Sequence, residues 1–274
     1  MELSEIVHSA IPGRATCQFD SSAESNPIGQ TKPGGTGIII VGPMTGQLEP
    51  QGKGGDSMGR WSYTTFRRQG VPPITIISVY QVCKEPTNVI GFTAWHQQKR
   101  ALDIAGRNIH PRTAFIDDLC KVVTTFQAKQ HAIIVGGDFN ECMDDTRSGL
   151  LRLATTTGLT DPWSTFKPNY PEFATRDPGS KRIDSVLVSP SIYDSIISMG
   201  YAPVARFVDS DHRGICLEFT GDRLLGPQSD VFPRPDYRGV KSTDKGKVTA
   251  FIEAWYTHLE SNSVFSKIDP MNQS

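Results

Sequence analysis

Hydrophobic and polar positions along the chain follow two different periods. Apolar residues alternate with polar ones in 60–68 and run almost continuously through 74–82, which predicts two strands that pair as a hairpin. In 112–129 they recur at spacings of three and four, which predicts an amphipathic helix. By the same criteria we predict strands over 34–42, 131–140, 182–189 and 213–220, an edge strand near 197–204, helices over 92–106, 147–159 and 244–260, and a helical turn at 191–197.

The domain organisation follows from where these periods begin and end. Residues 1–33 are rich in Ser, Pro and Gly and show little periodicity, which predicts a poorly ordered lead-in loop. Residues 48–59 also read as a loop. We predict one domain over 34–222, followed over 223–274 by a linker and a C-terminal amphipathic helix. Strands outnumber helices and turns join most of them, which favours an α+β class over a doubly wound parallel sheet.

Composition excludes several classes of function. The 274 residues carry a formal net charge of −1, so a polyanion would need a local basic patch. No apolar run approaches the ~20 residues that span a bilayer, and no secretory signal is visible, so we expect an intracellular protein of otherwise unknown location that does not bind a membrane. The five scattered cysteines include no CxxC pair, which argues against a zinc ribbon or a disulfide framework.

The segment GGDFN ends a predicted strand with chemically active groups. Asp138 and Asn140 lie two positions apart, so in an extended backbone their side chains point to the same side. A carboxylate can hold and activate a water, and an amide can donate a hydrogen bond to a developing negative oxygen. The alternative is an ordinary polar turn at a strand end.

Two further segments carry candidate chemistry. In SDHR, Asp211 beside His212 offers a metal ligand and a proton-transfer group, although a lone histidine is more often an ordinary surface residue. In RIDSVLVS, Asp184 begins an apolar strand, where a carboxylate needs a partner such as an imidazole. The alternatives for Asp184 are a solvent-facing edge position or a local pair with Arg182.

The order GDFN, RID, SDH resembles the endonuclease/exonuclease/phosphatase superfamily, which has the deoxyribonuclease I-like fold. The resemblance implies a four-layer α/β sandwich of two mainly antiparallel sheets flanked by helices, and hydrolysis of phosphate esters with Mg²⁺, or Mn²⁺ in its place. It implies that Asp138 orients or deprotonates the attacking water and that Asn140 binds a phosphoryl oxygen. Asp211 would approach the metal, His212 would stabilise the scissile phosphate, and Asp184 would hydrogen-bond His212.

Other segments extend the resemblance to roughly 34–260. Tyr80 in SVYQVC matches a tyrosine of the family that can reach the phosphate, with a core tyrosine as the equally weighted alternative. GRWSYTTFRR, ITIISVYQVC, FIDDL and the C-terminal tail resemble the endonuclease-like domains of non-LTR retroelements. Nucleic acid is then the expected partner, DNA favoured over RNA, with protein partners unknown. Arg60, Lys181 and Arg182 are the candidate backbone contacts.

The family pattern departs from this chain at its beginning. The family opens with a strand that carries Asn and a second strand that ends in a metal-binding Glu. No acid upstream of 34 follows an apolar strand here, so we expect the fold to lack its first strand or strands. Three functions stay open: a Mg²⁺-dependent nuclease, a non-catalytic nucleic-acid-binding remnant, or a phosphatase for small phosphoesters or phosphoinositides.

Overall fold

The chain forms two units, and a computed structural model describes seven stretches of it. The described residues are 15–21, 34–68, 70–84, 93–167, 173–204, 209–225 and 244–261. The first unit spans Met1–Pro233 and the second spans Arg234–Ser274.

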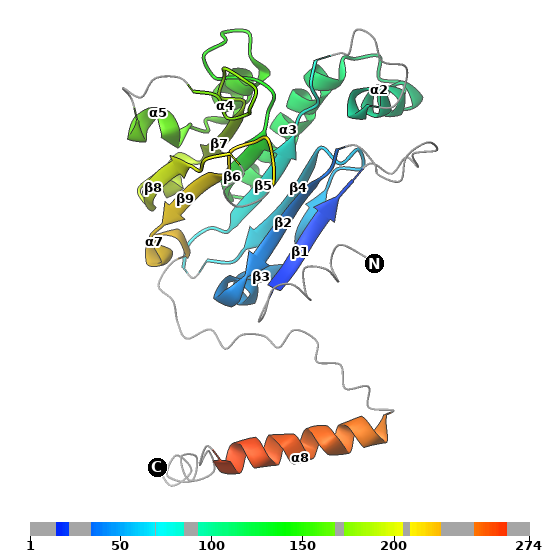
Figure 1. The fold of residues 1–274 in the computed structure, drawn as a ribbon, viewed down its shortest axis with the longest axis vertical. Helices are drawn as coiled ribbons and strands as arrows, with labels where there is room; N and C mark the ends of the chain where they lie inside the picture. Colours follow the sequence, from blue (N-terminus) through cyan, green and yellow to red (C-terminus); the bar gives the residue numbers. More distant parts are fainter. Residues whose placement is uncertain are drawn as a thin grey trace. The chain divides into compact units, whose positions relative to one another are not determined.

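A five-stranded mixed sheet forms the centre of the first unit (Figure 1). Its order is β3-β4-β5-β6-β7, and every neighbouring pair is antiparallel except β5 and β6, which are parallel. Trp61 pairs with Val79 across β4 and β5, so the predicted hairpin is confirmed. The strands span Leu48–Gly55 (β3), Trp61–Phe66 (β4), Ile74–Tyr80 (β5), Ala132–Asp138 (β6) and Asp184–Val188 (β7).

Helices α3 (Pro111–Ala128) and α4 (Gly149–Thr157) pack against one face of this sheet. Alternate positions of the strands, such as Ile77 and Val135, meet Phe115 and Leu119 of α3 in a fully buried cluster. The amphipathic helix predicted over 112–129 is therefore confirmed. α4 ends at Gly158, whose φ of +65° suits the left-handed C-terminal cap that glycine favours.

The opposite face carries a second core and two two-stranded sheets. Phe66, Ile74 and Val188 point to this side and pack with Ile40 of β2 and Met199 of β8. The two small sheets pair β1 (Ala15–Asp20) with β2 (Thr36–Val41), and β8 (Ile196–Tyr201) with β9 (Ile215–Phe219). Short helices complete the unit: η1 (Gly42–Gln47), α2 (Ala94–Ile104), α5 (Pro162–Phe166), α6 (Pro190–Tyr193) and α7 (Gly221–Leu225). The predicted α+β class, with sheets flanked by helices, is confirmed.

Three segments predicted to be irregular are regular. The predicted lead-in loop contains β1, which pairs with β2 along its whole length, so the loop prediction is wrong there. The predicted loop 48–59 contains β3, an edge strand with a bulge, where glycine and proline are tolerated. α7 crosses the predicted start of the linker at 223 and buries Leu224 and Leu225 in the second core. The rest of 1–33 apart from 15–21, and 226–243, lie outside the described residues, so the predicted domain bounds stay predictions.

The second unit contains helix α8 (Lys245–Ser261), close to the helix predicted over 244–260. Its apolar side chains Phe251, Ile252, Trp255 and Tyr256 are exposed. Among the described residues, no helix combines the length and apolar character needed to cross a bilayer.

Candidate active site

Three neighbouring strands present polar residues at one edge of the central sheet. Because β5 and β6 are parallel, both end there, with Tyr80 directly opposite Asp138. β7 is antiparallel to β6 and begins at the same edge, so Asp184 pairs with Asp138 on the side of β6 away from β5. The pairing of the strands therefore brings Tyr80 and Asp184, which lie 58 and 46 positions from Asp138 along the chain, to either side of it.

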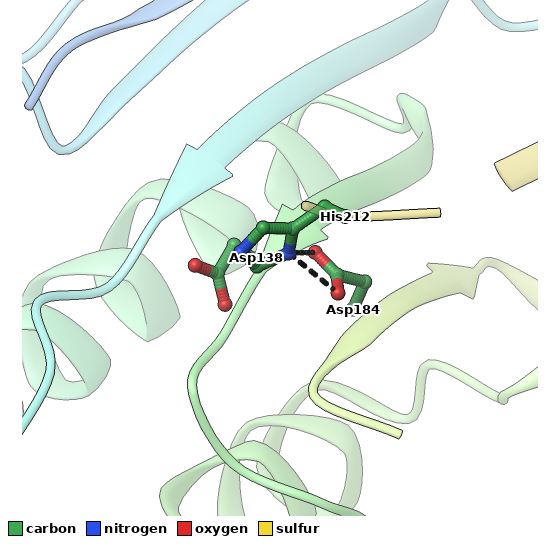
Figure 2. Close-up of side chains that lie close together, drawn as sticks. All are labelled: Asp138, Asp184 and His212. Atoms are coloured by element: carbon green, nitrogen blue, oxygen red, sulfur yellow. Dashed lines mark hydrogen bonds and ion pairs between the residues drawn. The ribbon is translucent and has the colours of Figure 1, made fainter. Parts of the chain in front are cut away.

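His212 joins this edge from the segment that precedes β9. Its Nδ1 lies 2.9 Å from Oδ2 and 3.0 Å from Oδ1 of Asp184. Figure 2 shows the imidazole between the carboxylates of Asp138 and Asp184, and one ligand atom from each of the three residues lies within 4.8 Å of the others. The hydroxyl of Thr175 accepts hydrogen bonds from the backbone N–H groups of Ile183 and Asp184 and so fixes the start of β7.

Asn140 is locked onto Asp138. Its backbone N–H donates to Asp138 Oδ1 at 2.8 Å, and its Nδ2 donates to Asp138 Oδ2 at 2.9 Å and to the Gln81 carbonyl at 2.7 Å. The turn that allows these bonds gives Asn140 a φ of +48°, which asparagine tolerates better than most residues. Both side-chain amide protons of Asn140 are therefore engaged, one by the Asp138 carboxylate and one by the Gln81 carbonyl.

Gln81 is a further component of the site that the sequence analysis missed. It is fully buried directly after β5. Its backbone N–H donates to the Asp138 carbonyl, and its Nε2 donates to the Phe139 carbonyl at 2.7 Å. Together with the bond from Asn140, these contacts hold the turn at the end of β6 in place. The polar residue inside SVYQVC was the signal that could have identified it.

Burial changes the acid strength of two groups at this edge. Burial raises the pKa of Asp138 to about 6, and the charge of Asp184 acts in the same direction, while the hydrogen bonds from Asn140 and the charge of His212 act against it. Burial also raises the pKa of Tyr80 to about 12, with smaller contributions from Cys83 and Asp138. Asp138 can therefore exchange a proton near neutral pH, whereas Tyr80 stays a neutral hydrogen-bond donor.

Asp211 lies beside this cluster, but its nearer partner is Arg176. Its Oδ2 accepts a hydrogen bond from Nε of Arg176 at 2.8 Å, and this bond lowers the pKa of Asp211. Its Oδ1 is 4.0 Å from Nε2 of His212. Among the described residues, the group that could hold a metal ion is Asp138, Asp184 and His212. The predicted metal role of Asp211 stays a prediction. To bind a metal ion, the carboxylate would have to share or give up its ion pair with Arg176.

The donor types of this group fit a divalent cation in part. Carboxylate oxygens are the donors that Mg²⁺ and Mn²⁺ prefer, and Asp138 and Asp184 supply them. Both carboxylates already accept hydrogen bonds, Asp184 from His212 and Asp138 from Asn140, so a cation would have to share these oxygens with their present donors.

Two of the predicted nucleic-acid contacts are not available at the surface, and the third is. Arg60 is 3% exposed and pairs with Asp56 and Asp118. Arg182 is 4% exposed and pairs with Asp161. The predictions for Arg60 and Arg182 are therefore wrong, because Arg60 neutralises two partly buried carboxylates and Arg182 neutralises a buried one. Lys181 is exposed and lines a cavity beside Asn140.

Comparisons with known proteins place the fold. No protein-family model matches the chain, and no curated protein matches it. Among solved structures, the 3′ phosphatase NExo from Neisseria, bound to a product DNA hairpin, matches at a TM-score of 0.50 and 18% identity over 80% of this chain and 83% of that one. An AP endonuclease from Archaeoglobus fulgidus matches at a TM-score of 0.51 and 13% identity over the same shares.

These two likenesses show the fold, which is that of endonuclease/exonuclease/phosphatase proteins, as the sequence predicted. The endonuclease domain of TRAS1, a telomere-specific non-LTR retrotransposon, also matches, with 16% identity over 74% of this chain and 80% of that one. Its TM-score of 0.45 is too low to support an argument, so the resemblance to retroelements stays a prediction.

Proposed function

We propose that the protein is a phosphodiester hydrolase that acts on nucleic acid, with DNA favoured over RNA and Mg²⁺ favoured over Mn²⁺ as its cation. The observation that carries this proposal is the convergence of Asp138 with the hydrogen-bonded pair Asp184–His212 at one edge of the sheet. The solved relatives with this fold include a phosphatase bound to DNA and an AP endonuclease, which supports phosphate-ester chemistry on nucleic acid.

Each side chain then has a defined task. Asp138, with a pKa of about 6, accepts a proton from the water that attacks phosphorus. Asp184 fixes the imidazole through Nδ1, which leaves Nε2 of His212 to contact the scissile phosphate. Asn140 orients the Asp138 carboxylate and reaches a phosphoryl oxygen only by releasing one of its two present acceptors. A bound divalent cation would neutralise charge on the phosphate.

Nicking of supercoiled plasmid in the presence of Mg²⁺ tests this proposal. We expect Asp138→Ala and His212→Ala each to lower the rate by about 100-fold or more, since each removes a group that acts on the reacting atoms. Asp222→Ala, a change of an exposed carboxylate on α7, is the control and should nick at the wild-type rate. Nicking that survives both active-site changes would remove these residues from the mechanism.

The ion pair between Asp211 and Arg176 favours a second candidate, a nucleic-acid-binding protein without catalysis. This ion pair occupies Asp211, the acid to which the family resemblance assigns the role of metal ligand. Calorimetric titration separates the two candidates: salt-dependent DNA binding with no uptake of Mg²⁺ or Mn²⁺ supports the binding protein. Release of phosphate from small monoesters without nicking would instead indicate a phosphatase.

A further inference from the structure

One cavity opens beside Asn140, at the loop that leads from β6 to α4, and a second cavity adjoins the first. The first has a volume of about 450 Å³. Its wall includes Asn140, two positions after Asp138, and Ile183, directly before Asp184. The second, of about 700 Å³, lies between α3 and α4 and shares Arg112 and Arg147 with the first. The two cavities therefore form a path that leads away from the candidate active site.

The first cavity has an excess of positive charge. Its wall contains Lys84, Arg112, Arg147 and Lys181 against Glu141 and Asp145. Arg112 is neutralised by Glu141 at 2.7 Å, and Arg147 lies 4.0 Å from Asp145. Lys84 and Lys181 are exposed and make no ion pair within the part of the chain that the structure describes. Two exposed ammonium groups, with no counter-charge among the described residues, thus line a cavity beside the proposed site of phosphate hydrolysis.

Arg112 makes the wall rigid rather than serving as a ligand. From the start of α3 it donates to the Val82 carbonyl at 2.6 Å, to the Asn140 carbonyl at 3.1 Å and to Glu141. Glu141 in turn accepts from Ser148 and from the backbone N–H of Leu150. The wall between the cavity and Asn140 is therefore held by five hydrogen bonds, and the free cations lie at its rim.

We propose that this path binds the phosphates next to the scissile bond, so that the substrate is a nucleic-acid strand of several nucleotides. The inference rests on the proposed function, since it places the scissile phosphate at Asp138 and His212. The next anions along a nucleic-acid strand are the phosphates of the adjacent nucleotides, and Lys84 and Lys181 each bind one of them. A small phosphomonoester has no second phosphate and leaves these lysines unused.

The double variant Lys84→Ala/Lys181→Ala tests the assignment by binding and by hydrolysis. Binding of a fluorescent single-stranded oligonucleotide is measured by anisotropy over a range of salt concentrations. We expect the slope of log affinity against log salt to become shallower by about 1.4, or about 0.7 for each lost phosphate contact. The ratio of kcat/KM on the oligonucleotide to kcat/KM on bis(4-nitrophenyl) phosphate should fall by about tenfold or more.

Lys129→Ala/Lys167→Ala is the matched control, since it removes the same charge from two exposed lysines outside both cavities. The control should keep the wild-type salt slope and substrate ratio. Equal effects of the two double variants would overturn the inference. If the wild type hydrolyses neither substrate, the proposed function fails, and the anisotropy slopes still decide whether these lysines bind the strand.

Discussion

At the scale of single residues, the Asp138 carboxyl couples function to stability. Its pKa is about 6 in the folded protein and near 3.8 when free of the fold, so the native state holds more protons between these values. By linkage, the stability that this group contributes falls as pH rises through that interval and stays low above it. At neutral pH the charged Asp138 carboxylate therefore lowers the free energy of unfolding. A functional group that destabilises the fold is common at active sites.

Asp138→Asn removes this charge and should stabilise the protein more at neutral pH than in acid. We expect the thermal midpoint of the variant, relative to wild type, to rise between about pH 4 and about pH 6 and then to level off. Circular dichroism in EDTA measures both proteins across the series. Asp222→Asn, which removes an exposed carboxylate of α7, supplies the control for the loss of one negative charge outside the site. A difference for Asp138→Asn that is constant with pH would contradict the raised pKa.

Gln81 offers a second test at this scale, since its amide holds the Phe139 carbonyl. Gln81→Met leaves that buried carbonyl without its donor, and we expect the free energy of unfolding to fall by about 1–3 kcal/mol. We also expect kcat to fall more than KM changes, because the turn that carries Asp138 and Asn140 loses a support.

Gln127→Met is a close control for Gln81→Met. The Gln127 Nε2 also donates to a backbone carbonyl, that of Thr157, at 2.7 Å, but this bond joins α3 to α4 and lies outside the site. The control should lose stability without the selective loss of kcat. A similar kinetic defect in both variants would assign Gln81 a general structural role.

Sequence could predict the identities at the site but not every partner. Asp138 and Asp184 were identifiable because each is an acid at the end of an apolar strand, and His212 because the order GDFN, RID, SDH resembles a known family. Arg60 and Arg182 were misassigned because an arginine beside a strand looks the same in sequence whether it binds a phosphate or a buried carboxylate. The pairing of Asp211 with Arg176 spans 35 positions, and no local pattern indicates it.

At the scale of elements, the register between β5 and β6 aligns Tyr80 with Asp138. Gly137 makes this register possible: its φ is +150°, and a Cβ there would lie 2.0 Å from the Val79 carbonyl oxygen of β5. The backbones of β5 and β6 therefore lie so close at Gly137 that no side chain larger than that of glycine fits between them.

Gly137→Ala should therefore separate β5 from β6 at the active-site edge. We expect a loss of about 3 kcal/mol in the free energy of unfolding, the upper end of typical overpacking costs, together with loss of nicking. Gly136→Ala is the neighbouring control, because its Cβ would meet Val186 Cγ2 at 3.0 Å, a side-chain atom that can yield. Urea denaturation compares the two, and equal losses would refute the role given to Gly137.

The elements that the sequence missed share a physical cause. β3 is Gly-rich, and its edge position tolerates residues that strand propensity disfavours. β1 is short, and its partner β2 lies beyond an interval of 15 residues, so its pairing depends on distant contacts. The central strands and α3 were predictable because each buries a regular apolar face.

At the scale of the whole molecule, the hydrophobic cores and the candidate site lie in the first unit. Every residue of the three buried clusters falls between Ile40 and Leu225. α8 has no buried residue among those described, although four large apolar side chains stand on it. Removal of α8 therefore takes no described residue out of these clusters.

Ending the chain after Pro233 tests this separation. We expect the thermal midpoint and the plasmid-nicking rate to match those of the full chain, because no described core residue is removed. Leu224→Ala in the full chain is the contrasting variant: this leucine of α7 is buried in the second core, and its loss should cost about 2–5 kcal/mol. Differential scanning calorimetry compares the three proteins. A truncated chain that melts as early as Leu224→Ala would show that the C-terminal residues protect apolar surface of the first unit, and that the fold needs both units to be stable.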